Sequence, residues 1–131
     1  MSFLSTLILD DEELNLLDCS FTFTQGTDYT GRPSEKPRGG QIRLLIEGTA
    51  KTDFLEWMIS PNLTKKGSIT FYRRDTMAGL KKVEFTEAHC IEYNESFNST
   101  DNEPLKIFLI ISAKEIKVKG TTFTNNWPSK V

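Results

Sequence analysis

Apolar and polar residues alternate along most of this chain with a period of two, which is the pattern of a β-strand that buries one face. Within residues 41–47, Ile42, Leu44 and Ile46 share one face, and polar side chains share the other. Residues 20–24 alternate in the same way. The pattern therefore predicts strands within residues 3–9, 14–24, 39–49, 67–75, 81–93, 104–120 and 121–124.

The segment 105–118 is apolar on both faces in its first part, where one face carries Leu105, Ile107, Leu109 and Ile111 and the other carries Phe108 and Ile110. We therefore expect this strand to be covered on both sides. Its apolar phase changes later, at Ile116 and Val118. This change predicts a bulge or bend within residues 112–115.

One segment, residues 53–59, has the pattern of a helix. Asp53, or Thr52 before it, can cap the first turn, and Glu56 stands three residues after Asp53, as in a capping box. Pro61 ends the segment. A one-sided apolar stripe is expected to pack against the strands, and it consists of Phe54, Leu55, Met58 and Ile59.

The order of these elements is strands, one helix and then more strands, without an internal repeat. A chain of 131 residues is long enough to bury a core of its own, and we expect residues 1–131 to form a single domain. The predicted fold class is mainly β: a small antiparallel barrel or sandwich with one flanking α-helix.

Charge and composition narrow the range of functions. The net charge of −2 and the pI of about 5.5 do not favour a nucleic-acid or membrane-surface partner. A basic and aromatic stretch over residues 65–74 suits single-stranded nucleic acid, but Asp75, Glu84 and Glu87 lie close to it in the sequence and oppose that interpretation. No apolar run has the length of a membrane span. The N-terminus lacks a basic leader and a cleavage site, so we interpret it as a strand and not as a signal peptide.

No group of residues has the spacing of a catalytic or metal site. His89 is the only histidine, and it shows no ligand spacing with Cys19 or Cys90, which we expect to be reduced thiols. A run of four acidic residues lacks the register of a calcium loop and is expected to form a solvated turn: Asp10, Asp11, Glu12 and Glu13. The sequence therefore predicts no enzyme, no metal and no cofactor.

The longest connection between predicted strands is polar: TDYTGRPSEKPRGGQ, residues 27–41, with two prolines, three glycines and five charged residues. A connection longer than about 12 to 15 residues is uncommon in a compact domain and is usually functional. Pro33 and Pro37 stiffen the backbone and so limit the entropy lost on docking. We interpret the segment as an arm that reaches a protein surface, with a solvated excursion as the alternative.

Five stretches, taken in order, resemble one family: MSFLSTLILD, TGRPSEKPRGGQI, TDFLEWMISP, GSITFYRRD and NNWP. Together they resemble the type VI secretion tube protein family (TssD, also called Hcp, haemolysin-coregulated protein), in the version found in Bacteroidota. The resemblance covers nearly the whole chain. It does not extend to the opening and loop motifs of the proteobacterial members.

The resemblance implies a β-barrel with one flanking helix, related to phage tail tubes, and a function that needs no active site. Such proteins form rings of six copies, and the rings stack into a hollow tube inside a contractile sheath. Contraction expels the tube, with a spike protein at its tip and effector proteins in its lumen or on the spike. The resemblance also implies assembly in the cytoplasm and secretion without a signal peptide.

In this family an extended loop between early strands reaches the neighbouring ring, and residues 27–40 match that loop by position. The resemblance thus predicts a ring-stacking loop with the contact residues Asp28, Tyr29, Arg32, Glu35, Lys36 and Arg38. The predicted acceptor on the next ring is the turn of Asp10, Asp11, Glu12 and Glu13. Trp57 is predicted to lie at a subunit boundary.

Two other interpretations stay open at this stage. The first is a related contractile-tail component, such as a phage-like or toxin-delivery tube or baseplate piece. The second is a monomeric β-barrel that binds a small ligand. A protein that stays monomeric at all concentrations would favour the ligand-binding barrel.

Overall fold

The computed structural model describes residues 3–48, 53–73, 79–100, 105–125 and 127. Its elements follow the order strands, helix and strands that the sequence predicts: β1 Phe3–Leu9, β2 Glu12–Phe21, β3 Gln41–Glu47, α1 Phe54–Ile59, β4 Lys65–Arg73, β5 Gly79–Phe97, β6 Leu105–Val118 and β7 Thr121–Thr124. β5 is longer than the predicted strand 81–93, and β2 starts two residues earlier than predicted and ends before Thr24.

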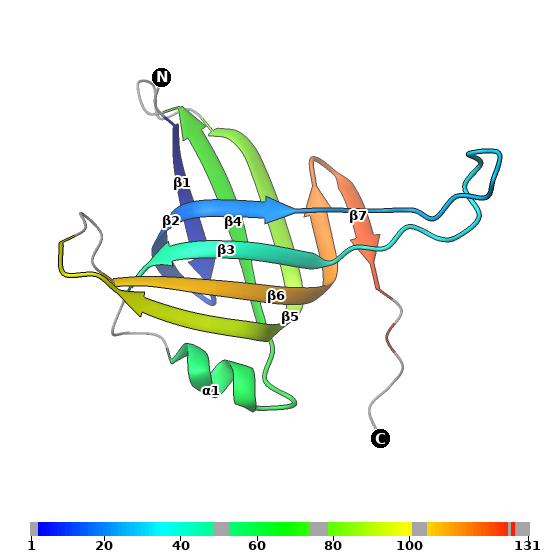
Figure 1. Cartoon of the computed structure of the whole chain (residues 1–131). Helices are drawn as coiled ribbons and strands as arrows, with labels where there is room; N and C mark the ends of the chain where they lie inside the picture. Colours follow the sequence, from blue (N-terminus) through cyan, green and yellow to red (C-terminus); the bar gives the residue numbers. More distant parts are fainter. Residues whose placement is uncertain (1–2, 49–52, 74–78, 101–104, 126, 128–131) are drawn as a thin grey trace.

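The strands form one antiparallel sheet that closes on itself. Neighbours follow the order β3-β2-β1-β4-β5-β6-β7, and an additional pairing of β3 with β6 joins β1 to β6 into a six-stranded barrel (Figure 1). β7 pairs with the last residues of β6. Closure removes most of the free strand edges that an open sheet would expose. The predicted fold class, a small antiparallel barrel with one flanking helix, is confirmed.

The core lies inside the barrel and follows the alternation seen in the sequence. Ile42, Leu44 and Ile46 of β3 point inward and are buried, as predicted. They pair with Ile111, Leu109 and Ile107 of β6, which are buried as well. Among the described residues, no polar or charged residue is fully buried. Burial of apolar area therefore provides the main stabilisation of the barrel.

The apolar phase of β6 changes where the sequence predicts it. Ala113 is the last residue of the first buried series, and Ile116 begins the next. The alternation of buried and exposed residues in β5 also changes phase opposite this point. Phe85 and Ala88 are both buried although they are three residues apart, and Glu87 between them has a left-handed φ of 48°. Both strands bend here, as Figure 1 shows.

The bulge in the ladder between these strands lies elsewhere, in β5 and not in β6. The register of β5 against β6 shifts between Cys90 and Glu92, which leaves Ile91 as the extra residue. The expected coverage of β6 on both sides is also incomplete in this chain. Phe108 and Ile110, on its outer face, are only half-buried.

The helix begins where the sequence predicts, but it buries a different face. Asp53 caps it, because its Oδ1 accepts a hydrogen bond of 3.0 Å from the backbone N–H of Glu56. The buried residues are Phe54 and Trp57, whereas the predicted stripe residues Leu55, Met58 and Ile59 are exposed. The two aromatic side chains bury more area than the aliphatic ones would, so they occupy the side that faces the barrel.

Candidate functional site: the arm and the acidic turn

Residues 22–40, called the arm from here on, connect β2 to β3 and project from one end of the barrel (Figure 1). The arm is a folded ribbon. Thr24 and Arg38 exchange two backbone hydrogen bonds, of 2.8 Å and 2.6 Å, and the N–H of Ser34 donates to the carbonyl of Gly26 at 2.9 Å. The arm thus extends the β2–β3 hairpin in an ordered form, as its prolines suggested.

Asp28 holds the tip of the arm in shape. Its Oδ1 accepts hydrogen bonds from the hydroxyl of Thr30 at 2.6 Å, the N–H of Thr30 at 2.9 Å and the N–H of Arg32 at 3.1 Å. The Thr30 hydroxyl is the main cause that lowers the pKa of this carboxyl, and the two N–H groups lower it further. Gly31 adopts a φ of +88° that glycine tolerates best. Asp28 therefore acts within the tip.

The base of the arm is anchored to the barrel by residues that sequence reasoning missed. Phe23 packs edge-to-face on Phe123 of β7, with ring centroids 5.1 Å apart. The side-chain amide of Asn125 donates to the carbonyls of Gly39 at 3.2 Å and Ala113 at 3.0 Å. These contacts join positions far apart in the sequence, so no local pattern could have found them.

The charged side chains of the arm fall into two groups. Arg38 and Glu35 form an exposed ion pair of 2.9 Å with each other. Arg32 and Lys36 are exposed and form no ion pair with any described residue, and Tyr29 at the tip is 100% exposed. Tyr29, Arg32 and Lys36 are thus the predicted contact residues that remain available to a partner.

The predicted acidic turn is a tight connection between β1 and β2. Asp10 and Asp11 have φ angles of 51° and 88°, as a two-residue turn of the I′ type requires, while Glu12 and Glu13 already belong to β2. The prediction of a turn is confirmed for its first two residues.

Asp10 ties this turn to the start of β4. Its Oδ1 accepts a hydrogen bond of 3.0 Å from the N–H of Lys66, and its Oδ2 lies 3.3 Å from the Nζ of Lys65. The Oε1 of Glu12 is shielded from water and has no hydrogen-bond partner among the described residues. Asp11 and Glu13 are exposed and form no ion pair within the described part of the chain.

The turn also borders the start of α1. A depression of about 520 Å³ lies between them, and its acidic lining consists of Asp10, Asp11, Glu12, Asp53 and Glu56. Asp53 and Glu56 are acidic neighbours of the turn that sequence reasoning did not include. Because the arm extends away from the barrel (Figure 1), its cations do not meet the acidic turn within one subunit.

Trp57 belongs to the core of its own subunit. Its side chain is 1% exposed, and its Nε1–H donates a hydrogen bond of 3.0 Å to the carbonyl of Ala88. Phe54 beside it stacks on Tyr93, with ring centroids 6.5 Å apart. Trp57 is thus part of the core under α1, and the prediction that it lies at a subunit boundary remains a prediction.

The thiols and His89 form no reactive group. Burial raises the pKa of both Cys19 and Cys90 to about 11, so both are protonated and unreactive near neutral pH. The His89 ring contacts that of Trp127, with centroids 5.4 Å apart. In the described part of the chain, no group of three or more potential ligands could hold a metal ion. No described helix has the length and hydrophobicity needed to cross a bilayer.

Both the sequence and the fold of the chain match those of a known protein family. The model of the family "Hemolysin coregulated protein Hcp (TssD)" matches residues 1–128. The chain belongs to the Hcp (TssD) family. It is similar to Hcp1 from Flavobacterium johnsoniae, with 38% identity, 93% of this chain and 99% of that chain covered, and a TM-score of 0.86. None of the curated proteins matches the chain.

More distant Hcp structures share the fold. Hcp1 from Salmonella typhimurium is 14% identical, with 95% of this chain and 93% of that chain covered and a TM-score of 0.74. A chain of the PVC sheath-tube complex, from an extracellular contractile injection system, is 19% identical, with coverage of 89% and 88% and a TM-score of 0.54. Family membership makes the chain a structural tube subunit of type VI secretion and not an enzyme, as the sequence predicted.

Proposed function

We propose that this Hcp subunit closes with five further copies into a ring, and that the rings stack into a hollow tube. A contractile sheath surrounds the tube and expels it, with a spike protein at the tip, to deliver effector proteins. The subunit assembles in the cytoplasm and is released from the cell with the tube. Apolar side chains such as Leu7, Ile69 and Phe85 fill the interior of the barrel. The contacts that this role requires therefore lie on the outer surface of the subunit.

The observation that carries the proposal is the arm. It is folded by its own hydrogen bonds, anchored at its base, and exposed along residues 27–38. A segment ordered before it docks loses little conformational entropy on binding. Such a ribbon, projecting from a closed barrel, fits a contact with the next ring of the stack better than a solvated excursion does.

The stacking contact pairs cations of the arm with acids of the next ring. Arg32 and Lys36 are available for this contact, and Arg38 can exchange its exposed partner Glu35 for a carboxylate of the next ring. On the acceptor side, Asp11 and Glu13 of the acidic turn are exposed and form no ion pair with any described residue. Exposed ion pairs are weak one by one and screened by salt, so we expect stacking to weaken as ionic strength rises.

A second candidate function is a tube subunit of a related contractile injection system. The likeness to the PVC sheath-tube complex favours it at the level of fold. The two candidates share the ring and the stack and differ in the sheath and spike that surround them. Genes for a type VI sheath and spike beside this one would favour the first.

Light scattering after size exclusion, at two protein concentrations, tests the ring. Six subunits of 14.9 kDa give a particle of about 89 kDa, and negative-stain images of that peak should show rings with an open centre. A single species of 14.9 kDa at the higher concentration would overturn the proposal. The monomeric ligand-binding barrel would then be the better interpretation.

A further inference from the structure

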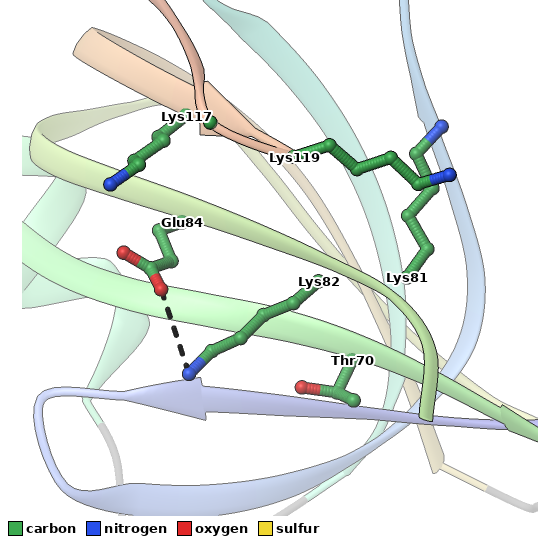
Figure 2. Close-up of a pocket in the computed structure, with 7 residues that line it drawn as sticks. Thr70, Lys81, Lys82, Glu84, Lys117 and Lys119 are labelled. Carbon is green, nitrogen blue, oxygen red and sulfur yellow. Dashed lines mark ion pairs between the residues drawn. The ribbon is translucent and has the colours of Figure 1, made fainter. Parts of the chain in front are cut away.

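One side of the barrel carries a concentration of lysines. A depression of about 430 Å³, called the lysine depression from here on, lies over β4, β5 and the β6–β7 turn (Figure 2). Its charged and polar lining consists of Thr70, Lys81, Lys82, Glu84, Lys117 and Lys119. Four cations therefore surround one carboxylate, on a chain whose net charge is −2.

The single carboxylate is shared. Glu84 lies 3.6 Å from the Nζ of Lys82 and stands opposite Lys117 in the β5–β6 ladder. Lys81, Lys117 and Lys119 form no ion pair with any described residue; in Figure 2, Lys117 extends to one side of the depression and Lys81 and Lys119 extend to the other. Lys81, Lys82 and Lys117 lie on paired strands, so their backbone positions stay close together. Their mutual repulsion is relieved when an acidic surface covers them.

An acidic and apolar surface lies on α1. Leu55, Met58 and Ile59 are 51%, 39% and 69% exposed, and their i, i+3, i+4 spacing places them on one stripe of the helix. Glu56 and the cap residue Asp53 add two carboxylates beside this stripe, where they line the depression between the acidic turn and α1. A contiguous apolar patch with a charged rim is typical of an interaction site.

These two surfaces lie on different sides of the barrel. In Figure 1, α1 lies below the barrel, whereas the β6–β7 turn and the start of β5 lie toward its top. A ring closed by rotation needs a heterologous contact, in which one surface of each copy meets a different surface of the next. A two-fold dimer through either surface alone would instead oppose charges of the same sign.

We propose that the α1 surface of one copy docks onto the lysine depression of its neighbour, and that this contact closes the ring. The occupant of the lysine depression is thus a second copy of this chain. Glu56 and Asp53 face the ammonium groups of Lys117 and Lys119, and the apolar stripe covers the methylene stems of the lysines. This inference rests on the ring of the proposed function and adds the two surfaces that form it.

The test uses two variants that each reverse one side of the contact. Lys117→Glu/Lys119→Glu places acid against acid, and Glu56→Lys places a cation against cations. Asp53 is left intact because it caps the helix. We expect the light-scattering mass of each variant alone to fall from about 89 kDa to 14.9 kDa. Circular dichroism and thermal melting check that each variant is folded.

Mixing the two variants gives the decisive readout. In an alternating ring of six, every contact pairs either two native surfaces or two reversed ones, so opposite charges meet at each contact. We expect the equimolar mixture to restore the ring. Rings formed by each variant alone would overturn the inference, and so would a mixture that stays monomeric while both variants are folded. Failure of the unsubstituted protein to form rings would instead contradict the proposed function.

A matched pair of apolar substitutions tests the helix stripe. Ile59→Ser removes the most exposed side chain of the stripe, and Ile8→Ser removes an exposed isoleucine of β1 that lies outside it. We expect Ile59→Ser to raise the protein concentration needed for ring formation and Ile8→Ser to leave that concentration unchanged. Equal behaviour of the two variants would remove the stripe from the contact. If an acidic protein other than this chain occupied the lysine depression, Lys117→Glu/Lys119→Glu would leave the ring intact, and the inference would be wrong.

Discussion

Different interactions stabilise the barrel and the arm. Buried pairs such as Leu44 and Leu109 stabilise the barrel, and these side chains are removed from water. In the arm, backbone pairing at Thr24 and Arg38 and the hydrogen bonds to Asp28 set the conformation, and the side chains at the tip remain exposed. A change in one region should therefore leave the other folded, so that the stability of the subunit and the proposed stacking of rings can be altered separately.

The largest effect is expected from a cavity in the barrel. Leu109→Ala removes a fully buried side chain at the β3–β6 pairing that closes the barrel. We expect the free energy of unfolding to fall by about 2–5 kcal/mol, as measured by urea denaturation. Thr122→Ala, an exposed change on β7, is the control and should stay within about 0.5 kcal/mol of the unsubstituted protein. A Leu109→Ala loss as small as that of the control would show that closure contributes little to stability.

A smaller effect is expected under the helix. Trp57→Phe keeps most of the apolar volume but removes the N–H that donates to the carbonyl of Ala88. Leaving this buried carbonyl without its partner should lower the free energy of unfolding by about 1–3 kcal/mol. Thr122→Ala, the exposed change on β7, again serves as the control. The assignment of Trp57 to the core would be contradicted if Thr122→Ala proved the more destabilising of the two.

The thiols give a probe of the barrel that requires no substitution. Because burial raises the pKa of Cys19 and Cys90 from 9.0 to about 11, both favour the protonated form in the folded state. Their contribution to stability is present below pH 9.0 and is lost as pH rises toward about 11. At pH 9.5 we expect iodoacetamide to label the protein rapidly in urea and only slowly in the native state, as followed by mass spectrometry. Equal labelling rates in the two states would show that the thiols are not protected.

The smallest effect on global stability is expected at the tip of the arm. The hydrogen bonds to Asp28 lower the pKa of its carboxyl group below the ordinary value of 3.8. Their contribution to the stability of the tip is therefore fully present at pH values above 3.8, and it is lost as the pH falls through the lower pKa of the folded arm. Asp28→Ala should shift the amide NMR signals of Thr30 and Arg32 while the melting temperature stays unchanged. Asp28→Asn, which keeps one acceptor oxygen, should shift them less. A lowered melting temperature in Asp28→Ala would show that the arm and the barrel are coupled.

The sequence predicted what depends on local periodicity. Alternation at Ile42, Leu44 and Ile46 located a strand and its buried face, and the shift before Ile116 located the bend of β6. The cap at Asp53 located the helix, but its buried face was mistaken. A six-residue helix with apolar side chains on both sides gives no periodic signal strong enough to choose between them.

Features that depend on pairing between distant residues stayed out of reach. The bulge at Ile91 exists only in the register of β5 against β6, and the anchor of the arm joins Asn125 to Gly39. The same holds for the lysine depression, where the fold places Lys81 and Lys82 beside Lys117 and Lys119. The long polar connection marked the arm as a candidate, whereas only the three-dimensional structure distinguishes the charges that are available from those already engaged. Arg32 and Lys36 are available, while Asp28 is used within the tip.

We propose that surfaces of the barrel and its flanking helix form the contacts within a ring, and that the arm forms the contacts between stacked rings. Negative-stain images and light scattering of Arg32→Glu/Lys36→Glu, beside the unsubstituted protein under the same tube-forming conditions, test it most directly. We predict that the variant keeps rings of about 89 kDa and loses the stacked tubes. Tubes as long and as frequent as those of the unsubstituted protein, or loss of the rings themselves, would contradict the claim.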